Sequence, residues 1–326
     1  MRRPNQLSHS GFALWESNPD EFYLKYLSEK RAPRIPQERP AAAGSSFDAY
    51  VKAHLQHDLG LGLLPNLLGH YYESQVEPQN RDWALPIGAY IFDCYKISGF
   101  YDDLLNILKP ANNPRFEFSV EAEINGVPFN GKPDLGFDTA QGIAVVHDWK
   151  CNGMCSKSAV SPHKSYMKCR DGFVGKQTKS HDTEHKEFLG INHMDLTINT
   201  TYLEHANPKW ADQLSLYGWA LGEKIGDEDV VLSIHQIVAK PIPNERPQLR
   251  VAQYRARVTA AYQQELARRF RRCWDAITSG HIFLDMSRED SDARCAILED
   301  TAVGLQSDGS SLDSYFAEAT REGYRG

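Results

Sequence analysis

The chain has 326 residues, 41% hydrophobic and 24% charged, which are the proportions of a folded globular protein. Its 43 acidic residues outnumber 36 lysines and arginines, for a net charge of −7. This balance excludes a strongly basic coat protein for nucleic acid but is compatible with a local basic cleft. No apolar run suits a membrane span or a signal peptide. We therefore expect a cytoplasmic protein without a membrane partner, whose six cysteines are mostly reduced thiols.

Helical patterns dominate the first third of the sequence. Asn18-Pro19-Asp20 is a helix start signal, and apolar residues at helical spacing follow over 22–27. Residues 31–44 are rich in Pro, Arg and Ala and predict an exposed connector. A helix is expected from Ser46 over 46–56, and residues 83–108 are expected to be largely helical.

Strand patterns follow. Residues 116–124 alternate apolar and polar side chains, and Asn125-Gly126 is a hairpin turn signal. The return segment runs to Asp138, and residues 143–150 form a short, mostly apolar strand that ends in charged residues. Residues 116–150 are therefore expected to form a three-stranded meander.

The second half of the chain begins with a segment of little periodicity, residues 151–206, which predicts a long irregular excursion. A helix is expected over 210–221, a strand over 230–238 and a long helix with a run of arginines over 255–277. The remaining residues, 281–326, are acidic and partly rich in Ser and Gly, and predict a loose tail.

Two aspartates and a lysine at strand ends form the most informative pattern. Side chains alternate along a strand, so Asp148 and Lys150 face the same way, and a hairpin brings Asp134 alongside Asp148. Paired carboxylates bind a hard divalent cation, and a neighbouring lysine can stabilise charge that develops on a phosphate. The alternative interpretation is structural, with Asp134 as a turn residue and Lys150 as a solvated strand end.

A second pattern lies downstream on the expected helix 210–221. Gln213 and Tyr217 are four residues apart and therefore share one helix face. An amide and a phenol placed in this way can hydrogen-bond a sugar–phosphate backbone or a metal-bound water. Alone the pair is unspecific, because a helix that faces a core often carries such residues.

These patterns occur in the order of a known family. The pieces are Ser8-x-Ser10 before an aromatic helix, a helix with Gly44, a glutamate-rich strand, Gly131-x-Pro133-Asp134, Asp148-x-Lys150 and Gln213-x-x-x-Tyr217. In this set the chain resembles the PD-(D/E)XK nuclease superfamily, in the RecB-like branch of phage recombination exonucleases and CRISPR-adaptation nucleases. The resemblance covers about residues 5–280.

The resemblance implies a fold and a domain organisation. The expected α/β fold is restriction-endonuclease-like, with a central mixed sheet flanked by helices and a long insertion, residues 151–206, after the catalytic strand. The nuclease domain would span residues 1–280, followed by an acidic, partly flexible C-terminal tail over 281–326.

The resemblance also implies an activity and the residues that carry it. Asp134 and Asp148 correspond to metal-binding carboxylates, with the Trp149 carbonyl completing the metal shell. Lys150 corresponds to the catalytic lysine, and Gln213 and Tyr217 to the substrate-binding helix motif. The expected activity is a deoxyribonuclease dependent on Mg²⁺ or Mn²⁺, an exonuclease in DNA processing, recombination or repair, with DNA and a recombination or replication protein as partners.

The early helix departs from the family pattern. Many members carry a metal-binding His four residues after the glycine and an acid four residues further on. Here Asp48 and Lys52 occupy the two places. Asp48 remains a candidate metal ligand, and Glu121 or Glu123 of the neighbouring strand is a candidate for the missing acid.

Other functions remain open. A nuclease-like fold that binds DNA or a protein without cleavage is favoured if the missing acid is essential. A zinc-stabilised adaptor is a third possibility, although Cys-x-x-x-Cys is looser than the usual spacing; its ligands would be Cys151, Cys155, Cys169, His163, His181 and His185. Basic residues outnumber acidic ones over 150–186, so this segment would either follow a DNA backbone or form a solvated loop.

Overall fold

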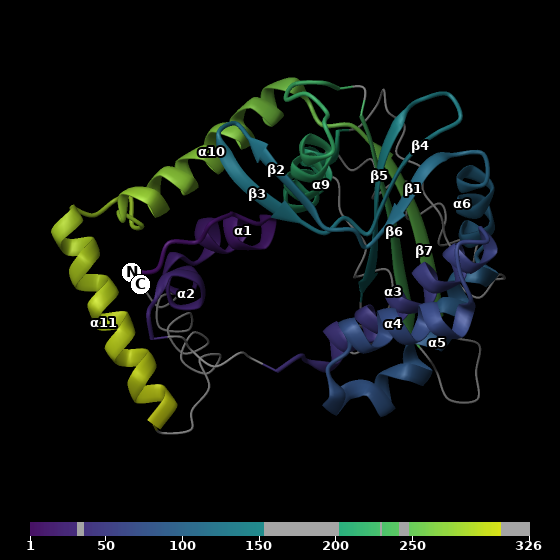
Figure 1. Cartoon of the computed structure of the whole chain (residues 1–326), viewed down its shortest axis with the longest axis horizontal. Coiled ribbons are helices and arrows are strands. Elements are labelled where there is room, and N and C mark those ends of the chain that lie inside the picture. Colours follow the sequence, from purple (N-terminus) through teal and green to yellow (C-terminus); the bar gives the residue numbers. More distant parts are fainter. Residues whose placement is uncertain (31–35, 153–201, 229, 241–247, 308–326) are drawn as a thin grey trace. The chain divides into compact units, whose positions relative to one another are not determined.

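The computed structural model describes residues 1–30, 36–152, 202–228, 230–240 and 248–307 (Figure 1). Most of the expected excursion, residues 153–201, lies outside this part. The chain divides into two compact units. Unit 1 comprises Met1–Pro36, Val120–Gly131 and Gln263–Gly326, and unit 2 comprises Gln37–Ser119 and Lys132–Tyr262.

Unit 1 consists of helices and a two-stranded ribbon. Its elements are α1 (His9–Ser17), α2 (Pro19–Phe22), a π-helical turn (Tyr23–Leu27), β2 (Val120–Ile124), β3 (Val127–Gly131), most of α10 (Ala260–Ser279) and α11 (Arg288–Ser307). The predicted helix start is confirmed, because the Asn18 side chain accepts a hydrogen bond from the Glu21 N–H at 3.1 Å and caps α2. In the segment expected as a loose tail, α11 is helical, and residues 308–326 lie outside the described part.

The hairpin turn of unit 1 has the backbone that its sequence demands. Asn125 and Gly126 both have positive φ, 51° and 73°, as a two-residue hairpin loop requires. The strands β2 and β3 that it joins pair with each other in a sheet of their own. The expectation of one meander over 116–150 is therefore wrong, although its hairpin is confirmed.

Unit 2 is a mixed α/β structure. Its helices are α3 (Arg39–Asp58), α4 (Leu64–Gln75), a 3₁₀ turn (Pro78–Asn80), α5 (Arg81–Ile97), α6 (Phe100–Leu108), α8 (Leu203–Ala206) and α9 (Pro208–Ala220). The connector expected over 31–44 ends early, because the strong helix formers Ala41, Ala42 and Ala43 extend α3 back to Arg39. The helix ends before Gly60, whose φ of 74° breaks the helical path.

The sheet of unit 2 has five strands in the order β1-β4-β5-β6-β7. The strands are β1 (Asn112–Phe116), β4 (Leu135–Asp138), β5 (Ala144–Asn152), β6 (Val231–Lys240) and β7 (Gln248–Ala256). Only β5 and β6 pair in parallel within this sheet. The expected mixed sheet with flanking helices is thus confirmed, but β7 occupies the start of the region that we expected to be helical from 255.

The two faces of this sheet carry different helices (Figure 1). On one face α3, α5 and α6 pack against Val145 and Trp149 of β5. On the other face lies α9, where a Cβ on Gly218 would be 4.0 Å from the Val146 side chain. Because side chains alternate along β5, Asp148 and Lys150 share the face of Val146 and point toward α9. Among the described helices, none combines the length and apolarity needed to cross a membrane.

Candidate active site

The hairpin of β4 and β5 brings two aspartates together. Leu135 of β4 pairs with His147 of β5, so Asp134, one residue before β4, lies beside Asp148. The two carboxyl groups are close enough for the Asp134 charge to raise the pKa of Asp148. The backbone N–H of Trp149 donates to Asp134 Oδ2 at 3.3 Å and fixes the orientation of that carboxyl.

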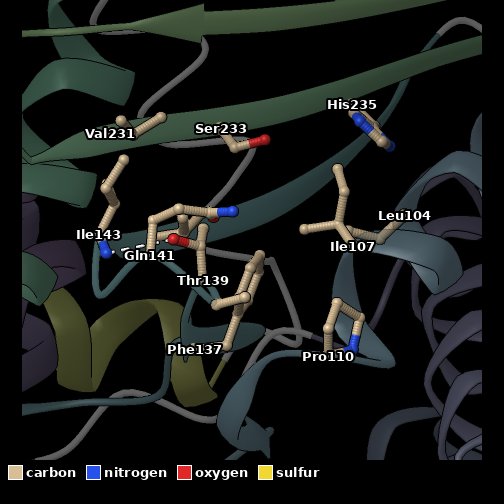
Figure 2. A pocket seen from close by; sticks show the side chains of 12 residues that line it. Leu104, Ile107, Pro110, Phe137, Thr139, Gln141, Ile143, Val231, Ser233 and His235 are labelled. Atoms are coloured by element: carbon tan, nitrogen blue, oxygen red, sulfur yellow. Dashed lines mark hydrogen bonds between the residues drawn. The ribbon is translucent and has the colours of Figure 1, made fainter.

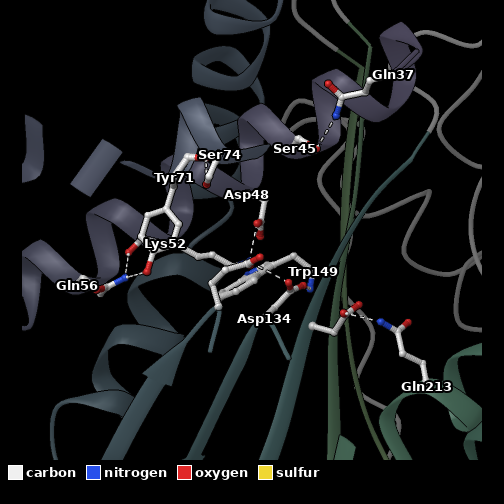
Figure 3. Close-up of polar contacts among 12 residues, drawn as sticks. Gln37, Ser45, Asp48, Lys52, Gln56, Tyr71, Ser74, Asp134, Trp149 and Gln213 are labelled. Carbon is white, nitrogen blue, oxygen red and sulfur yellow. Dashed lines mark hydrogen bonds and ion pairs between the residues drawn. The ribbon is translucent and has the colours of Figure 1, made fainter. Parts of the chain in front are cut away.

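Lys150 and Gln213 complete this arrangement from β5 and α9. Lys150 Nζ lies 2.5 Å from Asp148 Oδ2 and donates to Gln213 Oε1 at 3.0 Å. The Gln213 amide in turn donates to Asp148 Oδ1 at 3.4 Å (Figure 3). Tyr217, one turn along α9, is buried and hydrogen-bonded to Gln213. The amide of Gln213 therefore holds the aspartate and the lysine in one geometry.

A second group of carboxyls adjoins the first. Asp48 of α3, Glu117 after β1 and Asp134 each offer one oxygen, and these oxygens lie within 4.8 Å of one another. Their side chains are only 18%, 21% and 22% exposed. Three carboxylate oxygens are a suitable ligand set for Mg²⁺ or Mn²⁺, and Asp48 Oδ1 is buried and has no hydrogen-bond partner among the described residues. The cluster fits a divalent metal ion.

The sequence did not single out Glu117. We expected Glu121 or Glu123 to supply an extra acid, but both lie on β2 in unit 1. Glu117 belongs to unit 2, and its N–H donates to the Asp134 carbonyl at 3.0 Å. Its φ of 45° is uncommon for a residue with a side chain, and such backbone strain concentrates at functional sites.

Lys52 lies inside the carboxyl cluster. Its ammonium is 2.5 Å from Asp48 Oδ2 and 2.9 Å from Asp134 Oδ1, and it also contacts Glu117 (Figure 3). The Lys52 side chain has no exposed surface. The place where the family pattern has an acid therefore holds a buried cation with three acidic partners.

The charges of this site shift the ionisation of its members. Burial raises the pKa of Asp48 and of Asp148, and the neighbouring Asp134 charge raises both further. Burial is the largest influence on Asp134 and opposes its ionisation, but the charge and hydrogen bond of Lys52, the charge of Lys150 and the contact with Asp148 together hold the pKa of Asp134 below its ordinary value. Burial raises the pKa of Tyr217 to about 12, so this phenol is a hydrogen-bond donor at neutral pH.

A pocket of about 460 Å³ gives access to the site. Its lining comprises Ala41, Gly44, Ser45, Phe47, Asp48, Gln75, Glu117, Asp134, Trp149, Lys150 and Cys151. The three clustered carboxyls and the strand-end lysine thus border one solvent-accessible space. A ligand in this pocket would meet acidic oxygens and the Lys150 ammonium together.

A second pocket of unit 2, about 420 Å³, has a different character (Figure 2). Apolar side chains such as Leu104, Ile107 and Phe137 dominate its lining, which includes no Asp, Glu, Lys or Arg from the described part of the chain. Two of its polar residues contact other side chains of the fold: Ser233 Oγ lies 2.9 Å from His147 Nδ1, and His235 Nδ1 lies 2.6 Å from the hydroxyl of a buried tyrosine.

Most of the candidate zinc ligands fall outside the described residues. These are Cys155, Cys169, His163, His181 and His185. Cys151 lies at the end of β5. The zinc site thus remains a prediction.

Comparison with known proteins adds little to this geometry. No family model matches the chain, and no curated protein matches its sequence. A candidate exonuclease from Eubacterium rectale is similar in structure, with a TM-score of 0.41 and 14% identity over 85% of this chain and 82% of that one. SSO0001 has a TM-score of 0.27 and 11% identity over 84% of this chain and 86% of that one. At these TM-scores neither likeness identifies the fold family or the activity.

Proposed function

We propose that the chain is a metal-dependent nuclease that hydrolyses DNA phosphodiester bonds, with the restriction-endonuclease-like fold of the RecB-like PD-(D/E)XK branch. One observation carries the proposal. Asp134, Asp148 and Lys150 meet at the ends of adjacent strands, beside an acidic cluster and a pocket. Carboxylates that bind a divalent ion and a lysine that faces the same space are the groups that phosphodiester hydrolysis requires.

Each residue has a task in this reaction. A bound divalent ion would supply an acidified water and neutralise charge on the phosphate. Asp134, Asp148 and Asp48 would hold that ion, together with Glu117 and the Trp149 carbonyl. Lys150 would orient the attacking water and stabilise the negative charge that develops on the phosphate.

The helix α9 would position these groups and face the substrate. Gln213 bonds both Lys150 and Asp148, so its amide fixes the distance between the ammonium and the carboxyl. Tyr217 keeps its proton at neutral pH and donates within this network or to a phosphate oxygen. We propose exonuclease action on DNA ends, in recombination or repair with a partner protein, because this is the commoner activity of the branch that the sequence resembles.

Degradation of defined DNA substrates tests the proposal. Linear duplex, covalently closed circular and single-stranded DNA are incubated with Mg²⁺ or Mn²⁺ and, in parallel, with excess EDTA. The proposal predicts loss of linear DNA only with metal, while the circle resists. Full cleavage in EDTA would exclude the metal mechanism, and cutting of the closed circle would show an endonuclease.

The alternative is a nuclease-like module that binds DNA or a protein without cleaving. One observation favours it, namely that the Lys52 ammonium contacts all three carboxyls of the cluster. DNA binding without cleavage at any Mg²⁺ or Mn²⁺ concentration would select this function.

A further inference from the structure

We propose that Lys52 is the resident cation of the Asp48–Glu117–Asp134 cluster, where its ammonium and a divalent metal ion exclude each other. The inference deepens the proposed function, on which it rests, because it names the residue that sets the affinity of the site for metal. Lys52 and a bound metal ion would contact the same three acids. The lysine nitrogen lies 2.5 Å and 2.9 Å from oxygens of Asp48 and Asp134 and contacts Glu117, the same three acids whose oxygens could hold a metal.

The distances allow only one occupant at a time. A metal ion bound to all three carboxyls would sit about 2.0–2.6 Å from an oxygen of each. The oxygens of the cluster lie within 4.8 Å of one another, and the Lys52 nitrogen lies 2.5 Å and 2.9 Å from oxygens of two of the same carboxyls, so an ion held by these carboxyls would be close to the ammonium. Two cations so close together would repel strongly in a half-buried site.

The formal charges, counted with all four acids ionised, predict the effect of removing the ammonium. Asp48, Glu117, Asp134 and Asp148 contribute four negative charges, and Lys52 and Lys150 two positive ones. The remaining formal charge is −2. If Lys52 is made neutral, the remainder becomes −3, and the site should attract a divalent ion more strongly.

The two cations approach the cluster from different sides. Lys52 has no exposed surface and does not border the 460 Å³ pocket, whereas Asp48, Glu117 and Asp134 all do. A metal ion would therefore arrive from the pocket, while the ammonium reaches the same oxygens from the interior. The flexible four-carbon stem of lysine allows the ammonium to withdraw when the ion binds.

Metal titration of Lys52→Met, in the full chain and without DNA, tests the inference. Methionine preserves the length and apolar stem of lysine but removes the charge. We expect Mn²⁺, followed by calorimetry, to bind the variant at least tenfold more tightly than the wild type. In EDTA the variant should melt at a lower temperature, because three carboxyls have lost their cation, and Mn²⁺ should restore its melting temperature. Lys109→Met, at an exposed lysine of the same unit, is the control and should change neither measurement.

Each other outcome contradicts the inference. Equal or weaker Mn²⁺ binding by Lys52→Met would show that the ammonium does not compete, and no binding by either protein would show that the cluster does not exchange cations. If Lys52→Met does not fold, the same titration is carried out with Lys52→Gln. If neither variant folds at any Mn²⁺ concentration, a divalent ion cannot replace the ammonium. Because no step uses DNA, these results stand apart from the outcome of the degradation assay.

Discussion

Lys150 is the residue on which the proposed hydrolysis depends most directly. Its side chain is 23% exposed, and its ammonium is held by Asp148 and Gln213. Lys150→Ala should lower the cleavage rate about 100-fold or more, the typical loss when one preorganised donor is removed from a hydrolytic site. DNA affinity should change far less, because the carboxyls and the metal remain.

Cleavage rate, DNA affinity and melting temperature of Lys150→Ala separate the catalytic role from a structural one. The melting temperature should stay close to that of the wild type, since Lys150 belongs to neither hydrophobic cluster of the described residues. Lys109→Ala is the matched control at an exposed lysine. A folded Lys150→Ala protein with near wild-type cleavage would identify Lys150 as a solvated strand end.

Asp148 should make the metal-free protein less stable as pH rises. Burial raises its pKa to about 7, against the opposing charge of Lys150. In the unfolded chain the same proton leaves near pH 3.9, the ordinary value for Asp. Between about pH 4 and 7 the unfolded state therefore binds fewer protons than the folded state, and the free energy of unfolding falls over this range and levels off above it.

The side chain of the Asp148→Asn variant carries no charge at any pH, so the stability of this variant should not fall between pH 4 and 7 for this reason. In EDTA the variant should melt like the wild type near pH 4 and at a higher temperature from pH 7 upward, by about 2–4 °C for each kcal/mol recovered. Thermal melts from pH 4 to 8 measure the difference, with Asp138→Asn on β4 as the control for loss of one charge. Parallel wild-type and Asp148→Asn curves at all pH values would mean that Asp148 is ionised without penalty.

The close contact between helices α3 and α5 depends on one glycine. A Cβ on Gly88 of α5 would lie 2.0 Å from Ser46 Oγ and 2.7 Å from the Ser46 backbone carbon of α3. Gly88→Ala should therefore force the helices apart and cost about 1–3 kcal/mol or more. Because α3 carries Asp48 and Lys52, metal affinity should change as well.

Gly69→Ala is the matched control, because nothing lies within 4 Å of a Cβ at that position on α4. This substitution should stabilise the protein by up to about 1 kcal/mol through helix propensity alone. Denaturant unfolding measures both variants. Similar stability of Gly88→Ala and Gly69→Ala would show that α3 and α5 are not in close contact at Gly88.

Local signals predicted the elements better than their partners. The Asn18-Pro19 cap and the Asn125-Gly126 turn act within a few residues, so the sequence predicts them directly. The choice of strand partner depends on long-range packing, which local alternation does not encode. For this reason we expected β2 and β3 in the main sheet, placed no strand at β7, and missed β1 beside β4.

The candidate site likewise contains some residues that local sequence patterns predict and others that they do not. Strand alternation and hairpin pairing place Asp134, Asp148 and Lys150 together without knowledge of the rest of the fold. Lys52, by contrast, contacts Glu117 and Asp134, which lie 65 and 82 residues further along the chain. No short-range pattern marks such a lysine, or distinguishes Glu117 from the two glutamates that follow it on β2.

Whole-molecule charge bears on how a nuclease of this composition would bind DNA. The net charge of −7 opposes binding, so a local excess of basic residues should carry it, and residues 150–186 have such an excess. Replacement of residues 157–187, which lie outside the described part, by a Gly/Ser linker should weaken DNA binding and reduce its dependence on salt concentration.

Fluorescence anisotropy with labelled DNA across a salt series measures both effects. The melting temperature should change much less than the affinity, because the replaced residues are predicted to contact phosphates and not the core. A linker of equal length with the lysines retained is the control. Unchanged affinity and an unchanged salt slope would show that this segment does not contact DNA.

Unit 1 is assembled from the two ends of the chain. Trp15 Nε1 donates to the Ile282 carbonyl at 3.2 Å, and the Tyr23 hydroxyl donates to Glu299 at 2.6 Å. During synthesis at about 5–20 residues per second, the first helices therefore wait on the order of ten to fifty seconds for their partners, while the residues of unit 2 emerge and fold. Over that interval the apolar side chain of Phe12 lacks Phe270, the ring of α10 that it contacts in the folded unit, so the nascent chain needs protection from aggregation until α10 leaves the ribosome.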